Sequence, residues 1–188
     1  MLQLLISSVM ESYRAPRAAV RGVIDRVDSI EGVAIIFALS FALQAMVLAI
    51  SALVFGTVEA GLFGVLAGAL TVSALSFAVI VGLAFGIGRM FGGQGSLLDI
   101  ATAIAWHSLV TVIFAPFLGT LPVGPADQAG ANPIQIVIFV IVFWLFANFI
   151  AEAHKFASAW RVAGAMIGIM LGMGVLLSIL IFGSISGP

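Results

Sequence analysis

The sequence predicts an all-α polytopic membrane protein: a bundle of five transmembrane helices preceded by an N-terminal amphipathic helix at the membrane interface. Three observations lead to this prediction. Hydrophobic residues make up 63% of the 188 positions and charged residues only 8%, whereas a soluble domain carries about 25% charged residues. Five long apolar runs follow one another, and every basic residue lies before the first run or in alternate gaps. A soluble globular protein is therefore excluded.

The composition also excludes several classes of function. Seven Lys plus Arg against eight Asp plus Glu give a net charge of −1, so the basic surface that a nucleic-acid partner requires is missing. The chain has no cysteine, which excludes a disulfide framework, a thiolate metal site and a Cys nucleophile. We expect no cofactor and no nucleic-acid partner.

Each apolar run has the length of a membrane span. An α-helix rises 1.5 Å per residue, so about 20 apolar residues cross about 30 Å of hydrocarbon. Ser96 is expected to cap the third span, with Asp99 in its first turn. The predicted spans are residues 33–55, 62–87, 97–118, 134–151 and 162–182. Residues 1–31 are then an N-terminal cytoplasmic segment, and residues 32–188 are the membrane domain.

The basic residues predict the orientation. Four arginines precede the first span, Arg89 follows the second, and Lys155 and Arg161 lie between the fourth and the fifth. The loops on the opposite side, 56–61 and 119–133, hold none. Because basic residues are retained on the cytoplasmic side during insertion, the N-terminus is expected inside and the C-terminus outside. Four or six spans would place a basic segment on the wrong side.

The segment after Pro16 has the pattern of an amphipathic helix. Apolar residues recur at helical spacing, namely Val20, Val23, Ile24 and Val27. The arginines expected at lipid-headgroup height are Arg14, Arg17, Arg21 and Arg26. Two interpretations remain open and are compatible: the helix lies in the membrane interface, or its apolar stripe packs on the cytoplasmic ends of the spans.

The centre of the chain resembles the Yip1 domain family. Residues 91–109 read FGGQGSLLDIATAIAWHSL and run on to Ala115 and Pro116; in that family a Gly-Gly-x-Gly-Ser/Thr turn opens a span that ends near a proline. Pro16 in the N-terminal helix and a late span with Trp144 leading into a Gly-rich last helix also fit. The resemblance implies five spans, a cytoplasmic N-terminus and an exoplasmic C-terminus.

The resemblance implies little about activity. Eukaryotic members act in transport from the endoplasmic reticulum to the Golgi and bind Rab GTPases through a longer cytosolic N-terminal region. The short N-terminal segment here indicates a bacterial member in the plasma (inner) membrane, for which the family supplies a fold and no agreed activity. No catalytic residue is carried over.

His107 is the candidate intramembrane polar residue. It lies ten residues into the third span, near the bilayer midplane, where an ionisable group is a functional-site candidate. Gln44 in the first span lies at matching depth and is a possible hydrogen-bond partner. Three roles remain open: a structural polar contact, a proton or substrate site, and a metal or haem ligand. The last needs a second histidine, and His154 lies at a different depth.

A cytoplasmic patch is the second candidate site. Its expected members are Arg89, Asp99, Asn148, Glu152, Lys155 and Arg161. Glu152 and Lys155 are three residues apart and can pair on a helix. The patch is either a docking surface or an ordinary belt of interfacial charges.

Glycines mark the helix faces expected to pack. In lipid, helices associate through close backbone approach, which small residues permit. The expected packing residues are Gly82, Gly86, Gly164, Gly168 and Gly172. We expect mostly internal use, with one face left for a protein partner or for a second copy.

These observations favour a non-enzymatic integral membrane protein that acts as a scaffold, a lipid-interacting protein or an accessory subunit of a membrane complex. The alternative is a small-solute or ion transporter or channel with a midplane site around His107. An enzyme is disfavoured because two histidines and no intramembrane carboxylate leave too few acid–base groups at one depth.

Overall fold

The computed structural model describes residues 2–54, 62–115, 117 and 133–185, and the regular structure within them is helical throughout. The elements in chain order are α1 (Leu2–Arg14), α2 (Pro16–Ile24), α3 (Ile30–Val54), α4 (Leu62–Met90), α5 (Leu97–Thr111), the 3-10 turn η1 (Val112–Phe114), α7 (Pro133–Ala153) and α8 (Ala159–Ile185). Five of them, α3, α4, α5 with η1, α7 and α8, are long and apolar enough to cross a membrane. This confirms the predicted all-α polytopic bundle.

The observed helices match the predicted spans with small shifts at their ends. Helix α3 begins at Ile30, three residues early, and includes Glu31 in its first turn, where a carboxylate interacts favourably with the helix dipole. Ser96 caps α5 as expected, in a capping box with Asp99. The predicted loop 56–61, and the loop 119–133 apart from Pro133, lie outside the described residues.

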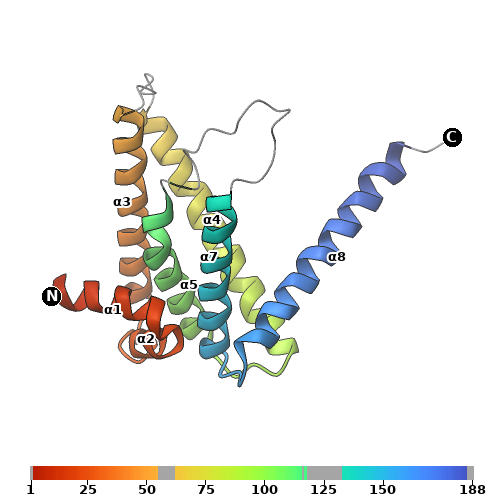
Figure 1. The fold of residues 1–188 in the computed structure, drawn as a ribbon, viewed down its shortest axis with the longest axis horizontal. Helices are drawn as coiled ribbons and strands as arrows, with labels where there is room; N and C mark the ends of the chain where they lie inside the picture. The colour runs from red at the N-terminus through yellow and green to blue at the C-terminus, as the bar shows by residue number, and fades with distance from the viewer. Residues whose placement is uncertain (1, 55–61, 116, 118–132, 186–188) are drawn as a thin grey trace.

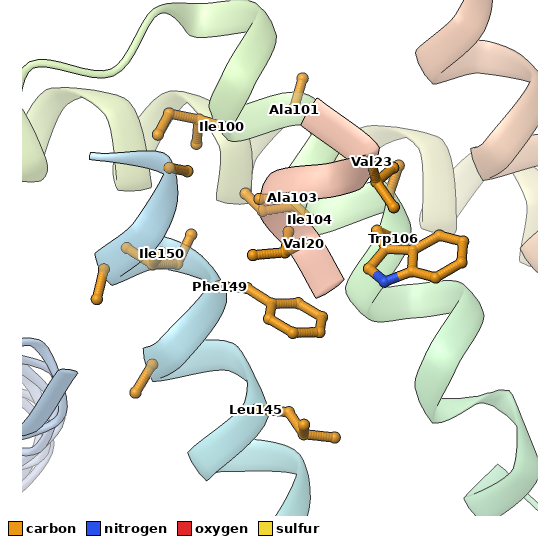
Figure 2. Close-up of a cluster of buried hydrophobic side chains, with 14 of the residues drawn as sticks. Val20, Val23, Ile100, Ala101, Ala103, Ile104, Trp106, Leu145, Phe149 and Ile150 are labelled. Atoms are coloured by element: carbon orange, nitrogen blue, oxygen red, sulfur yellow. The ribbon is translucent and has the colours of Figure 1, made fainter. Parts of the chain in front are cut away.

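Helix α5 is the centre of the bundle. It contacts α2, α3, α4 and α7, and every side chain from Ile100 to Trp106 is buried. Three alanines, Ala101, Ala103 and Ala105, allow neighbouring helices to approach its backbone closely. Figure 2 shows this core, in which Phe149 of α7 faces the residues of α5.

The two N-terminal helices pack against the ends of the spans. Val20 and Val23 of α2 are buried in the core with α5 and α7, which is the packing alternative that the sequence left open. Helix α1 is held by two long-range hydrogen bonds: Trp106 Nε1 donates to Ser12 Oγ over 3.0 Å, and Tyr13 donates to the carbonyl oxygen of Val110. Figure 1 shows both helices lying across one end of the bundle.

Helix α8 departs from the other spans. It contacts α7 near the corner that joins them, and in Figure 1 it then runs outward, with its C-terminal end far from the bundle. Side chains from Ile167 to Ile179 are exposed in the single chain. Such a helix has lipid or another protein as its neighbour.

Candidate functional site

Glu152 joins the end of α7 to the N-terminal helix α2. Its carboxylate accepts hydrogen bonds from Arg17 Nε over 2.7 Å and from Arg21 Nε over 2.7 Å. Arg17 also donates to the carbonyl oxygens of Phe156 and Ala157, which follow α7. We call these three charged residues, Arg17, Arg21 and Glu152, the arginine clamp.

The arginine clamp is explained by its place at the end of a helix. A carboxylate near a helix C-terminus is unfavourable next to the negative end of the helix dipole, and guanidinium groups reverse that sign. The Glu152 side chain is 12% exposed, so its charge needs such partners. The hydrogen bond to Glu152 raises the pKa of Arg21 above its ordinary value.

The clamp bears on two predictions from the sequence. Arg17 and Arg21 were expected at lipid-headgroup height; their guanidinium groups bind Glu152, yet their side chains remain 35% and 42% exposed. Arg14 and Arg26 are exposed, and contact of these arginines with headgroups stays a prediction. The predicted pairing of Glu152 with Lys155 is wrong, because Glu152 forms its ion pairs with Arg17 and Arg21 of α2. Lys155 is exposed and adopts a positive φ of 60° where α7 ends.

The other members of the predicted cytoplasmic patch have separate local roles. Asp99 accepts a hydrogen bond from the backbone of Ser96 over 2.8 Å in the capping box. Asn148 is 4% exposed and donates to the carbonyl oxygen of Trp144. Arg89 lies over the ring of Phe85. The structure therefore brings Glu152 together with two arginines of α2, and not with Asp99 or Asn148.

His154 was not among the predicted site residues, yet it is almost completely buried, with 1% of its surface exposed. Its Nε2 donates to the carbonyl oxygen of Ala84 in α4 over 3.0 Å, and its own carbonyl oxygen accepts from Gln94 over 3.0 Å. Burial lowers the pKa of the imidazole. His154 thus joins the end of α7 to α4 and to the turn before α5.

Glycines form the pocket around the His154 ring. A Cβ added to Gly88 or Gly93 would overlap the imidazole, and one added to Gly95 would overlap the carbonyl oxygen of Ala153. Gly92 in the same turn has a φ of +82°, a conformation that glycine adopts readily. The Gly-Gly-x-Gly turn is therefore required by the close approach of the α7 corner.

His107 contacts α7 and not α3. Its Nε2 donates to the carbonyl oxygen of Val142 over 3.1 Å, and its ring meets Phe146 and Phe149 edge-on. Gln44 instead lines a small pocket of about 190 Å³ between α3, α4 and α5. The predicted partnership of His107 with Gln44 is thus corrected: the imidazole binds a backbone carbonyl of another helix.

The predicted packing glycines do not touch another helix. A Cβ added to any of them meets nothing within 4 Å among the described residues, namely Gly82, Gly86, Gly164, Gly168 and Gly172. Internal packing is therefore wrong for these faces among the described residues: α8 diverges from its neighbours, and Gly82 and Gly86 lie on an exposed side of α4. The glycines that do support close packing are Gly88, Gly93 and Gly95.

A large apolar groove separates α4, α7 and α8. Its volume is about 650 Å³. Some of the residues between Ile80 and Phe91, between Phe146 and Phe156, and between Ala157 and Met170 line it. Arg161 and Ser158 lie at the end where α8 begins.

Among the described residues, no group of three or more His, Asp or Glu side chains could hold a metal ion.

Comparison of the sequence with known protein families agrees with this architecture. The Yip1 domain matches residues 10–180, which include all five spans and the Gly-rich turn that holds His154. The chain therefore belongs to the Yip1 family of multi-span membrane proteins. No curated protein and no solved structure matches it.

Proposed function

We propose that this protein is a non-enzymatic scaffold or accessory subunit that binds a membrane helix of a protein partner, or of a second copy, through one face of α8. The face consists of Gly164, Gly168 and Gly172, and we call it the α8 glycine face. The observation that carries the proposal is that this face is exposed and meets nothing in the described chain.

The spacing of these glycines supports a helix as the occupant. Residues four apart lie on the same side of a helix, and glycine lets a second backbone approach closely enough for dispersion and weak hydrogen bonds. Lipid gains nothing from such a surface, since an acyl chain packs equally well on larger side chains. A partner helix is the occupant that uses it.

The rest of the fold supports α8 as a helix that is anchored at its start. The arginine clamp and His154 join α2, α4 and α7 close to the corner from which α8 starts. Helix α8 is therefore held at one end and free along most of its length, which suits a helix that engages a neighbour in the bilayer.

The orientation of this base is part of the proposal. The helix ends and turns that carry the seven basic residues meet at the end of the bundle where α1 and α2 lie (Figure 1). By the retention of basic residues, that end is cytoplasmic and the C-terminus is on the other side. The proposed location is the plasma (inner) membrane of a bacterium.

The test replaces Gly168 with Leu, which places a bulky side chain on the α8 glycine face. The full chain is extracted from its own membrane in polymer-bounded lipid discs, and the mass of the assembly is measured. Gly168→Leu is expected to reduce the assembly to a single chain. Gly174→Leu is the matched control, because Gly174 is also open but lies about 120° round the helix. An assembly unchanged by Gly168→Leu would contradict the proposal.

A second candidate is passage of a small polar solute. The observation that favours it is the pocket between α3, α4 and α5, whose lining includes the polar residues Gln44, Ser73, Ser76 and Ser108. His107 is not part of that lining. If the protein transports a solute, Gln44→Leu abolishes its flux in reconstituted vesicles, whereas His107→Gln leaves the flux intact.

A further inference from the structure

We infer that the groove between α4, α7 and α8 binds one anionic phospholipid of the cytoplasmic leaflet, with its phosphate at Arg161 and an acyl chain along α8. The groove shares Gly164 with the α8 glycine face, but Gly168 and Gly172 do not line it, so this inference goes beyond the proposed partner helix. The argument rests on the shape, the chemistry and the depth of the groove.

The body of the groove suits an acyl chain. Its volume of about 650 Å³ lies within the usual range for ligand sites, about 300–1,000 Å³. Side chains such as Leu83, Phe146 and Ile169 line it, and they offer no hydrogen bonds. A polar solute would lose its water there without compensation.

One end of the groove has the opposite chemistry. Arg161 and Ser158 line it, and α8 begins between them at Ala159, so the unpaired backbone N–H groups of its first turn add positive potential. No carboxylate pairs with Arg161 among the described residues, whereas Arg17 and Arg21 are both engaged by Glu152. The free charge complements a phosphate.

The distance between the two ends matches one leaflet. Met170 is nine positions after Arg161 along α8, which corresponds to about 14 Å, and half of the hydrocarbon core is about 15 Å. A phospholipid has its phosphate at the interface and its chain in the leaflet below. A partner helix would fill the apolar part but would complement Arg161 only with an Asp or Glu at that depth, whereas an anionic phospholipid always has its phosphate there.

The experiment titrates the detergent-purified full chain with phosphatidylglycerol and with phosphatidylcholine of the same acyl chains, and counts bound lipid by native mass spectrometry. One phosphatidylglycerol per chain is expected to remain bound under conditions that remove phosphatidylcholine. Arg161→Gln should weaken its binding about tenfold, because hydrogen bonds to charged groups are lost. Arg26→Gln, which removes an exposed arginine outside the groove, should have no effect.

A second pair of variants tests the body of the groove. Ala165 is half-buried in the lining, so Ala165→Phe should fill the groove and weaken phosphatidylglycerol binding by a similar factor. Ile167→Phe is the control, because Ile167 is exposed and lies about 160° round the helix from Ile169. If Ala165→Phe does not fold, Arg161→Gln alone decides.

Three outcomes would overturn the inference. Equal retention of both lipids would mean that the groove has no site for an anionic head group. Phosphatidylglycerol binding unaffected by Arg161→Gln and Ala165→Phe would place the lipid elsewhere. A change in assembly mass in Ala165→Phe with lipid binding intact would make a protein helix the occupant.

Discussion

Glu152 and Arg17 are 135 positions apart in the sequence, yet the carboxylate Oε2 accepts a hydrogen bond from the guanidinium Nε over 2.7 Å. The contact fixes the amphipathic helix α2 to the end of α7. It also leaves the two arginines of the clamp directed at the protein, while Arg14 and Arg26 remain exposed.

The first prediction concerns this contact. Glu152→Gln should lower the free energy of unfolding by about 1–2 kcal/mol, because hydrogen bonds to a charged acceptor are replaced by weaker neutral ones. Thermal unfolding in detergent measures the change. Glu11→Gln, at an exposed position of α1, should be close to neutral. A double-mutant cycle with Arg21→Gln should show coupling, and strict additivity would mean that the contact between Arg21 and Glu152 contributes no stability.

The second prediction concerns the glycines around His154. Gly88→Ala should destabilise the fold by about 1–3 kcal/mol, since the added methyl group overlaps a buried ring. Gly86→Ala, two residues away in the same helix, meets nothing and should be neutral or stabilising, because alanine favours helix by about 1 kcal/mol. His154→Ala should rescue Gly88→Ala in part. Equal effects of the two glycine changes would refute the close packing.

The third prediction is a pH dependence. Burial lowers the pKa of His154, the nearby Arg89 charge adds to that effect, and the hydrogen bond to Ala84 and the charge of Asp99 oppose it. Below about pH 6.5 the unfolded chain binds a proton that the folded chain excludes, so stability should fall as the pH is lowered through that range. His154→Gln should remove this part of the dependence in a series of unfolding curves. An unchanged slope in that variant would show that His154 is not its source.

The fold was largely predictable because its determinants are local. The length and hydropathy of the apolar runs define the spans, and the capping box of Ser96 and Asp99 is visible in four consecutive residues. The partners of long polar side chains were not predictable in the same way. The sequence around Arg17 looks the same whether its side chain faces lipid headgroups or Glu152, because the sequence alone does not show how close α2 lies to α7.

The candidate site shows the same limit in two glycine sets. The regular spacing of Gly164, Gly168 and Gly172 predicts a packing face, but which helix meets that face depends on the angle at which α8 leaves the bundle. Gly88 and Gly95 have no such period, and they pack against His154 and its neighbour Ala153. The available signals were the density of glycines in the turn after the second span and, far from it in the sequence, a histidine at the end of the fourth span.

The fourth prediction concerns topology. The split of seven basic residues to one side and none to the other predicts that reporters fused after Ala60 and after Pro188 are outside, and that those fused after Gly93 and after Ser158 are inside. Paired reporters that are active on opposite sides of the membrane measure this. A C-terminal reporter on the cytoplasmic side would contradict the five-span arrangement.

The most direct test of the central claim is photo-crosslinking in the native membrane. A photoreactive analogue is placed at Val175, which continues the α8 glycine face, or at Leu177, which lies about 160° away on the same helix; both side chains are exposed. The proposal predicts a protein adduct of defined mass from position 175 and lipid adducts from position 177. Lipid adducts alone at both positions, with no protein adduct, would contradict it.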